Sequence, residues 1–220
     1  MLRTESITHS YGEGSAAVTV LEDVSINIPE GGFTSIVGRS GSGKSTLLSV
    51  ISSLLRPEQG EVYFKDREIT SISGTETDRL RKEEFSIIFQ SHHLLPYLTA
   101  HENALLPFLD RVAPVSKELL QRGLYCLERV GLQGKQDRLP GQLSGGEQQR
   151  VAIARALVKS PSILFADEPC GSLDKNTGNE IMEILQQLNR DGLTIAMVTH
   201  DRIHASMAKD TIYLEDGRNI

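Results

Sequence analysis

Residues 38–45, with the sequence GRSGSGKS, constrain the fold more than any other part of the chain. They fit the pattern G-x-x-x-x-G-K-[ST] in full. A short apolar run at Phe33–Val37 precedes them, and a run with helical spacing begins at Lys44. A glycine-rich turn between a strand and a helix can close its backbone N–H groups around phosphates, beside the positive end of the helix dipole. A Gly/Ser loop that binds no ligand would not be expected to lie between a buried strand and a helix in this way. The segment therefore predicts a phosphate-binding P-loop in an α/β fold.

The side chains of the P-loop have separate expected roles. Lys44 can neutralise charge on the β- and γ-phosphates, and Ser45 can bind Mg²⁺. Thr46 follows in the first helical turn and is expected near the α-phosphate. The residues expected to hold the nucleotide here are Gly38, Arg39, Ser40, Gly41, Ser42, Gly43, Lys44, Ser45 and Thr46.

A second motif, at residues 162–168, ends an apolar run with two carboxylates, Asp167 and Glu168. Open α/β sheets place their sites at the carboxyl ends of the strands. On its own the pair could equally begin a surface loop. After a P-loop, it favours Asp167 as a Mg²⁺ ligand acting through water and Glu168 as the group that polarises the attacking water.

A third motif, LSGGEQQR at residues 143–150, precedes the apolar positions Val151, Ile153, Ala154 and Leu157, whose spacing fits one face of a helix. Ser144 therefore stands where a helix N-cap is expected, with free backbone N–H groups beside it. Such a turn can bind an anion. Taken alone, it could also be an ordinary turn before a core helix.

The composition limits the class of protein. The 220 residues are enough for one large α/β domain, or for such a domain with a small appendage. No run approaches the ~18–20 apolar residues that span a bilayer, and no signal peptide opens the chain, so we expect a cytosolic protein. The net charge of -6 gives no support to nucleic-acid binding. Cys126 and Cys170 have no metal-ligand spacing and are expected to be free thiols.

The order of the elements predicts the organisation. We expect strands at residues 2–9, 18–28, 33–37, 85–89, 163–166 and 194–199, hairpins at 61–70 and 210–220, and helices at 44–55, 74–82 and 178–189. Residues 99–139 are expected to be helical. The predicted fold is α/β, with a P-loop NTPase core around a mainly parallel sheet, an N-terminal antiparallel β-layer and an inserted α-helical subdomain. Residues 1–220 would form one domain, with residues 1–90 and 140–220 as the core and about 91–139 as the insert.

With these motifs in this order, the chain resembles the ATPase subunit of ATP-binding-cassette (ABC) transporters over nearly its whole length. Further family motifs match in order. The resemblance implies that Tyr11 stacks on adenine, that Gln90 contacts Mg²⁺ and the attacking water, and that His200 contacts the γ-phosphate. It also implies that Asp174, in the sequence Ser172-Leu173-Asp174, reaches across a dimer. Cys170 departs from the family pattern, which commonly has Thr there.

The subgroup can be narrowed by the segments QSHHLLP at residues 90–96, TAHEN at 99–103 and LP at 106–107. These resemble the lipoprotein-releasing (Lol-type) and macrolide-export (MacB-type) ATPases. The resemblance implies a cytoplasmic ATPase, peripheral on the inner membrane, with a permease docked near residues 90–107 and a periplasmic or outer-membrane partner. The expected function is ATP hydrolysis that powers export or extraction of a lipoprotein, peptide or drug.

One copy of each motif implies a homodimer. The chain's own P-loop, Gln90, Glu168 and His200 would surround one ATP with Mg²⁺, whereas the γ-phosphate bound to a second chain would be capped by Ser144, Gly145, Gly146 and Glu147. ATP would then strengthen dimerisation, and hydrolysis would open the dimer. A related alternative is an ABC ATPase that regulates a membrane partner without transport, as in cell division. An ABC ATPase acting on DNA or ribosomes is disfavoured, since the chain has neither a second cassette nor a long coiled coil.

Overall fold

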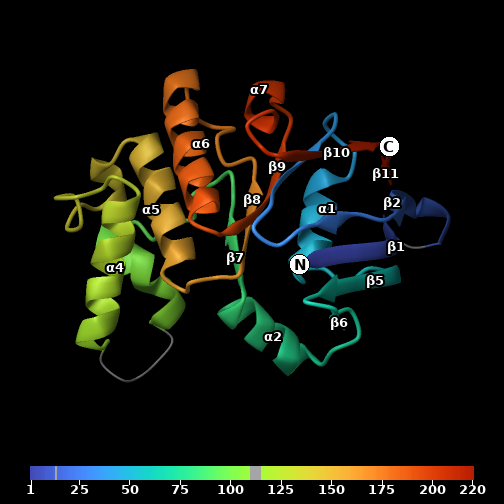
Figure 1. The fold of residues 1–220 in the computed structure, drawn as a ribbon, viewed down its shortest axis with the longest axis horizontal. Helices are drawn as coiled ribbons and strands as arrows, with labels where there is room; N and C mark the ends of the chain where they lie inside the picture. The colour runs from blue at the N-terminus through green and yellow to red at the C-terminus, as the bar shows by residue number, and fades with distance from the viewer. Residues whose placement is uncertain (13, 110–114) are drawn as a thin grey trace.

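The computed structural model describes residues 1–12, 14–109 and 115–220, which form two β-sheets and a group of helices (Figure 1). The larger sheet has the strand order β11-β10-β4-β9-β8-β7. All its neighbouring strands are parallel except the β10–β11 hairpin. Its strands are β4 (Phe33–Val37), β7 (Phe85–Ile88), β8 (Ile163–Asp167), β9 (Thr194–Thr199), β10 (Asp210–Glu215) and β11 (Arg218–Asn219). The expected mainly parallel sheet is confirmed.

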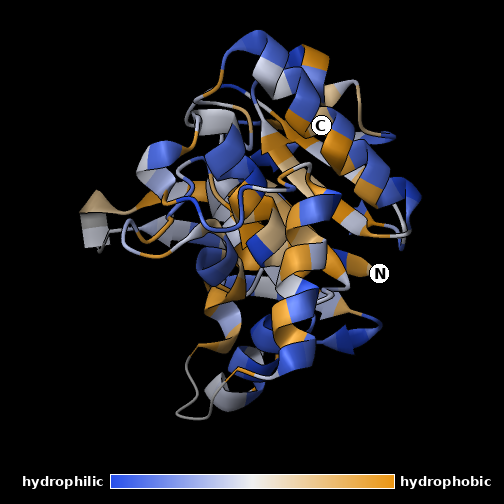
Figure 2. Ribbon diagram, turned by 90° about the vertical axis from the view of Figure 1, so that its left-hand side faces the viewer, coloured by the Kyte–Doolittle hydropathy of each residue, from blue (hydrophilic) through white to orange (hydrophobic). Residues whose placement is uncertain are grey.

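Helices cover both faces of this sheet, and the side chains of β8 show why. Leu164 and Ala166 pack into the core shared with the helices, whereas Ile163 and Phe165 pack into a second core on the opposite face. Since both faces are buried, the strand reads as a continuous apolar run instead of alternating. Figure 2 shows the same distribution, with hydrophobic residues on the inner strands and hydrophilic residues on the outer helices.

The second sheet is antiparallel and comes from the N-terminal region, as expected. Its strands are β1 (Leu2–Tyr11), β2 (Val18–Val24), β3 (Asn27–Ile28), β5 (Gln59–Phe64) and β6 (Arg67–Glu68). Lys65 and Asp66 both have positive φ, which is the conformation of a tight I′ hairpin turn. The expectation of one strand over residues 18–28 was wrong. The strand breaks after Val24, because Asp23 takes a left-handed φ of 55° and the N–H of Ile26 bonds to the Thr4 side chain.

Helix α1 lies between the two sheets and contributes apolar residues to the core that they share (Figure 1). It spans Lys44–Ile51 and is shorter than expected. The helix ends there because Ser53 has a left-handed φ of 59° and Pro57 follows in the next segment. The remaining helices of the core are α2 (Gly74–Glu83), α6 (Lys175–Arg190) and α7 (Arg202–Ala205).

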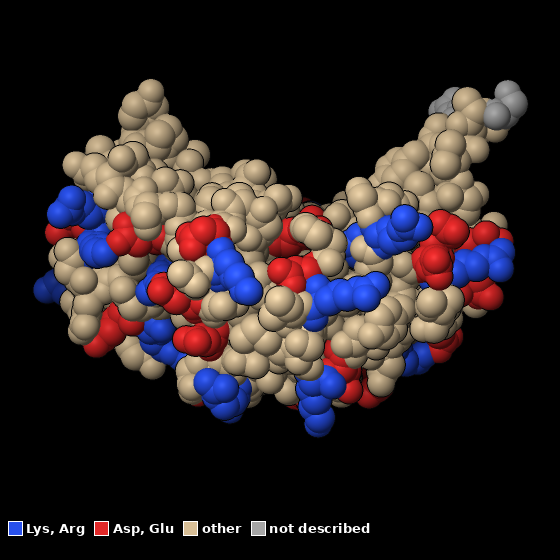
Figure 3. Space-filling view, turned by 90° about the horizontal axis from the view of Figure 1, so that it is seen from above, with Lys and Arg blue, Asp and Glu red and all other residues tan. Residues whose placement is uncertain are grey.

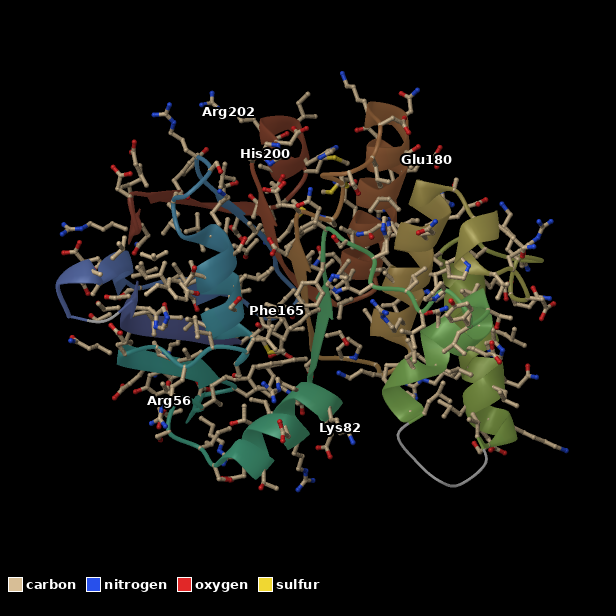
Figure 4. The ribbon with its side chains drawn as sticks, turned by 180° about the vertical axis from the view of Figure 1, so that it is seen from behind. Arg56, Lys82, Phe165, Glu180, His200 and Arg202 are labelled. Atoms are coloured by element: carbon tan, nitrogen blue, oxygen red, sulfur yellow. The ribbon has the colours of Figure 1, made fainter. Side chains whose placement is uncertain are left out.

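The helical layer beyond the other face consists of α3 (Ala100–Leu105), α4 (Lys117–Arg129) and α5 (Gly145–Leu157), with short 3₁₀ turns at η2 (Leu106–Phe108) and η3 (Pro140–Gln142). A further 3₁₀ turn, η1 (Gly14–Ala16), lies between β1 and β2 of the antiparallel sheet. Of the segment expected to be helical, residues 110–114 lie outside the described residues. An ion pair between Arg150 on α5 and Glu180 on α6 links this layer to the core. Figure 4 labels Glu180 on α6. None of the described helices is long and apolar enough to cross a membrane.

Candidate functional site

The P-loop is the connection between β4 and α1, where the sequence places it. Gly43 is the N-cap of α1 in a left-handed conformation, with a φ of 95°. A Cβ atom there would lie 2.6 Å from the carbonyl oxygen of Val20 on β2, so only glycine fits. The antiparallel sheet therefore rests directly against the phosphate loop. This contact brings the end of the β1–β2 hairpin, which carries Tyr11, to the same side of the molecule.

Lys44 is buried and turned back over the loop, where its Nζ donates a hydrogen bond of 2.8 Å to the carbonyl oxygen of Arg39. The Oγ of Ser42 is also buried and has no hydrogen-bond partner among the residues that the structure describes. A buried polar atom without a partner is rare in folded proteins and indicates a group that is missing from the site. A phosphate in the loop would supply that partner and an acceptor for Lys44.

Asp167, the last residue of β8, lies beside the first turn of α1. The Oγ of Ser45 donates a hydrogen bond of 3.2 Å to its Oδ1. Burial raises the pKa of the Asp167 carboxyl, while the hydrogen bond from Ser45 acts in the opposite direction. A half-buried carboxylate and a hydroxyl at this distance are hard oxygen ligands, so the pair fits Mg²⁺ held together with phosphate oxygens.

Glu168, Gln90 and His200 converge on the loop that follows β8. The Oε2 of Glu168 lies 2.6 Å from Nδ1 of His200, which follows β9. A Cβ atom on Gly171 would lie 2.9 Å from Nε2 of Gln90 and 3.1 Å from the same Oε2. Gln90, which follows β7, therefore approaches Glu168 from the other side. Figure 4 shows His200 and Arg202 at the edge of the sheet, away from Phe165 at its centre.

Asp201 supports this site and was missed by the sequence reasoning. Its Oδ1 accepts hydrogen bonds from the N–H groups of Ile203 and His204, so it caps α7 directly after His200. Its own N–H donates to Thr199 at 3.1 Å. The available signal was an aspartate at a helix start. The cap fixes the turn that carries His200.

A pocket of about 330 Å³ lies behind Glu168, between the start of α6 and α7, and Cys170 lines it. Burial raises the pKa of the Cys170 thiol to about 12. The thiol donates a hydrogen bond of 3.4 Å to the carbonyl oxygen of Gly178 on α6. Cys170 therefore retains the donor that a threonine hydroxyl would supply at this position.

The turn at residues 143–147 begins α5, and Ser144 is its N-cap, as expected. The Oγ of Ser144 accepts a hydrogen bond from the N–H of Glu147, and the Glu147 carboxylate accepts one of 2.7 Å from the N–H of Ser144. Ser144 and Gly145 are exposed. Among the described residues, no hydrogen bond or ion pair joins residues 144–147 to the P-loop. Within the described part of the chain, the turn is therefore not bonded to its own phosphate loop.

Asp174 and Tyr11 lie at the edges of the site. The carboxylate of Asp174 caps α6 by accepting hydrogen bonds from the N–H groups of Asn176 and Thr177. Tyr11 is half exposed at the end of β1, and its ring meets the ring of His9 edge-on, with centroids 4.9 Å apart. Its exposed face is open for stacking.

Comparison with known proteins accounts for this arrangement. The family model described as ABC transporter matches residues 21–171. The chain is 43% identical to the ABC transporter ATP-binding protein MJ0796 of Methanocaldococcus jannaschii, over 99% of this chain and 94% of that protein. It is 44% identical to the lipoprotein-releasing system ATP-binding protein LolD of Aquifex aeolicus, over 90% of this chain and 88% of that protein.

The macrolide export ATP-binding/permease protein MacB of Sodalis glossinidius is 41% identical over 99% of this chain, which spans only 33% of that protein. Among solved structures, a dimeric MJ0796 cassette matches 100% of this chain and 96% of its own, with a TM-score of 0.90 and 42% identity. A second MJ0796 structure, a dimeric post-hydrolysis state bound to ADP and Pi, has a TM-score of 0.89 and 41% identity.

The chain therefore belongs to the ABC transporter family. Within that family it is an ATP-binding cassette, the ATPase subunit that couples ATP hydrolysis to transport.

Proposed function

We propose that two copies of this chain form a head-to-tail dimer that holds two ATP molecules with Mg²⁺ and drives a membrane permease that exports or extracts its substrate. The observation that carries the proposal is the exposed, capped turn at Ser144, which has N–H groups for an anion and, among the described residues, no hydrogen bond or ion pair to its own P-loop. A second chain's γ-phosphate would complete it. The dimeric structures of MJ0796 support this arrangement.

In each site, Lys44 and the P-loop N–H groups bind the phosphates, and Ser45 and Asp167 would hold Mg²⁺. Magnesium there would offset charge on the phosphate oxygens. Glu168 accepts a hydrogen bond from the attacking water and polarises it. Its carboxylate also orients the His200 ring through Nδ1, which leaves Nε2 as the ring atom that faces the γ-phosphate.

The remaining site residues have proposed roles at the edges. Gln90 would contact the metal and the water from the β7 side, and Tyr11 would stack on adenine with its exposed face. From the second chain, Gly145, Gly146 and Glu147 contribute with Ser144, and Asp174 approaches the site from the start of α6.

A permease would dock at residues 90–107. This segment borders an open groove of about 700 Å³ between β7 and the turn before α5. Leu95 is half exposed and Tyr97 is 90% exposed, so both offer apolar surface to a partner. We further propose that residues 91–139 form a helical subdomain inserted in the core of residues 1–90 and 140–220. The protein would lie on the cytoplasmic face of the inner membrane, with a periplasmic or outer-membrane partner beyond the permease.

The dimer is tested by the Glu168→Gln variant, which removes the carboxylate charge that polarises water and keeps the phosphate ligands. We expect ATP and Mg²⁺ to shift this variant from monomer to dimer in size-exclusion chromatography with light scattering, while steady-state ATP turnover falls by about 100-fold or more. The double variant Glu168→Gln, Lys44→Ala is the control and should stay monomeric. A Glu168→Gln protein that stays monomeric at millimolar ATP would contradict the proposal.

A further inference from the structure

Arg155, near the end of α5, holds the segment that follows Gln90. Its Nη1 donates a hydrogen bond of 2.7 Å to the carbonyl oxygen of His93, and its Nη2 donates one of 2.8 Å to that of His92. Burial lowers the pKa of Arg155. In the described part of the chain, no carboxylate pairs with this guanidinium. Arg155 is thus a half-buried cation whose hydrogen bonds all go to the backbone of one segment.

The same segment also contacts the other end of α5. The ring of His92 has a buried Nε2 that has no hydrogen-bond partner within residues 1–12, 14–109 and 115–220. Burial lowers the pKa of His92, whereas the nearby backbone of Gly145 acts to raise it. Gly145 is the first residue of α5, directly after Ser144. His92 and His93 therefore lie along α5, with Arg155 at one end and the Ser144 turn at the other.

Helix α3 holds the remainder of the segment through hydrogen bonds. Asn103 on α3 is fully buried, and its Oδ1 accepts a hydrogen bond of 2.8 Å from the N–H of Leu95. Its Nδ2 donates to the carbonyl oxygens of Leu95, Leu98 and Thr99 at 2.8–3.1 Å. Figure 1 shows the chain after β7 crossing from the sheet to this helical layer. Residues 92–99 are thus attached to α3 and α5, whereas Gln90, just before them, lies against Gly171 and Glu168.

We propose that Arg155 is a positioning residue that joins the permease-docking segment to the Ser144 turn, so that the two move together. The proposal rests on the proposed function and deepens it. A displacement at Leu95 or Tyr97 is carried through the backbone of His92 and His93 to Arg155, and through α5 to Ser144. The permease thereby controls how Ser144 meets the second chain's ATP.

The test compares Arg155→Gln, Arg155→Lys and the surface control Arg129→Gln, each in the Glu168→Gln background. Arg155→Gln removes the charged donor pair, and we expect the dimer dissociation constant with ATP to rise about tenfold by analytical ultracentrifugation. Arg155→Lys keeps one charged donor, so its dimer dissociation constant should lie between those of the Glu168→Gln parent and the Arg155→Gln variant. Fluorescent-ATP affinity of the monomer should stay within about twofold for all three, because the P-loop is untouched.

Amide hydrogen exchange on the ATP-free monomer supplies the readout for coupling. In Arg155→Gln, exchange should rise both at residues 92–95 and at residues 145–147, whereas Arg129→Gln should change neither. Faster exchange at residues 92–95 alone, with dimerisation unchanged, would overturn the proposal. If the Glu168→Gln parent itself fails to dimerise, the proposed function fails, and the exchange data still decide the coupling. If Arg155→Gln does not fold, the same two measurements on Arg155→Lys decide it.

Discussion

Glu168 has a backbone conformation that few residues other than glycine adopt, with a φ of 48°. Its N–H bonds to the carbonyl oxygen of Val198 at 3.0 Å, and its own carbonyl accepts the N–H of Gly171. These bonds hold the strained turn, which directs the carboxylate toward His200 and Gln90. Such strain is concentrated at functional sites because the surrounding structure must impose it. The identity of a residue does not by itself indicate that its backbone is strained.

The thiol of Cys170 offers a prediction at this scale. Its pKa is raised from 9.0 to about 12 by burial, so its thiolate population near pH 8.5 should be about a thousandfold lower than in the unfolded chain. The Cys126→Ser variant leaves Cys170 as the single thiol. We expect iodoacetamide to label this variant slowly when folded and rapidly in guanidinium chloride, as followed by mass spectrometry. Equal rates in the two states would contradict the buried thiol.

Among individual residues, the sequence predicted the local positions of those that belong to a recognisable motif. Lys44, Asp167 and Ser144 lie in the local geometry that their motifs imply. Asp201 had a signal that the interpretation missed, an aspartate at a helix start, whereas Arg155 could not be assigned from its motif. The role of Arg155 depends on two backbone carbonyl groups that are distant in sequence. Every residue has a backbone carbonyl group, so the sequence does not indicate which ones Arg155 contacts.

At the scale of elements, the apolar runs and turn residues predicted most strands and helices, whereas the ends of elements were less predictable. β4 and β9 match their expected ranges because both strands are buried on both faces. α1 ends earlier and the strand over residues 18–28 divides, because Ser53 and Asp23 adopt left-handed backbone conformations. Those conformations depend on tertiary contacts that a local pattern does not contain.

The packing of α5 on α6 offers a prediction at this scale. A Cβ atom on Gly146 would lie 2.2 Å from Cγ2 of Thr177. We therefore expect Gly146→Ala to lower the free energy of unfolding by about 1–3 kcal/mol through overpacking, as measured by urea denaturation. Adding Thr177→Ser removes that methyl group, keeps the hydroxyl that donates to Asp174, and should restore most of the loss.

Gly145→Ala is the matched control for this packing. A Cβ atom there would lie 3.4 Å from Cδ2 of Leu173, close to an ordinary contact, so the unfolding midpoint should change little. If Gly146→Ala were as stable as Gly145→Ala, the close approach of α5 and α6 would be wrong.

At the scale of the whole molecule, the layers explain why one chain would contain the two half sites that we propose. The P-loop, Asp167 and His200 belong to the parallel sheet, whereas Ser144 begins a helix of the neighbouring layer. Figure 3 shows one face of the molecule, hollowed between two projections, on which acidic and basic side chains are interspersed. The sequence predicted both half sites. Their separation follows from how the layers pack, which no single motif encodes.

This separation leads to a prediction about mixed dimers. Lys44→Ala damages the P-loop half, and Ser144→Arg damages the opposite half, so each variant alone should lose nearly all ATPase activity. In a dimer of one chain of each kind, the Ser144→Arg chain supplies an intact P-loop and the Lys44→Ala chain supplies an intact Ser144. One of the two sites is then complete. An equal mixture should therefore recover up to about a quarter of the wild-type rate, since half of the dimers are mixed and each has one of its two sites complete.

The measurement is phosphate release by the two variants separately and after mixing. The double variant Lys44→Ala, Ser144→Arg mixed with wild type is the control, because every mixed dimer then has both sites damaged. That mixture should give less activity than the wild-type chain in it would give alone. If mixing the single variants restored nothing while both were folded and the mixture with ATP contained dimers of one chain of each kind, each ATP would be held by one chain, and Ser144 would have no role at the second chain's phosphate.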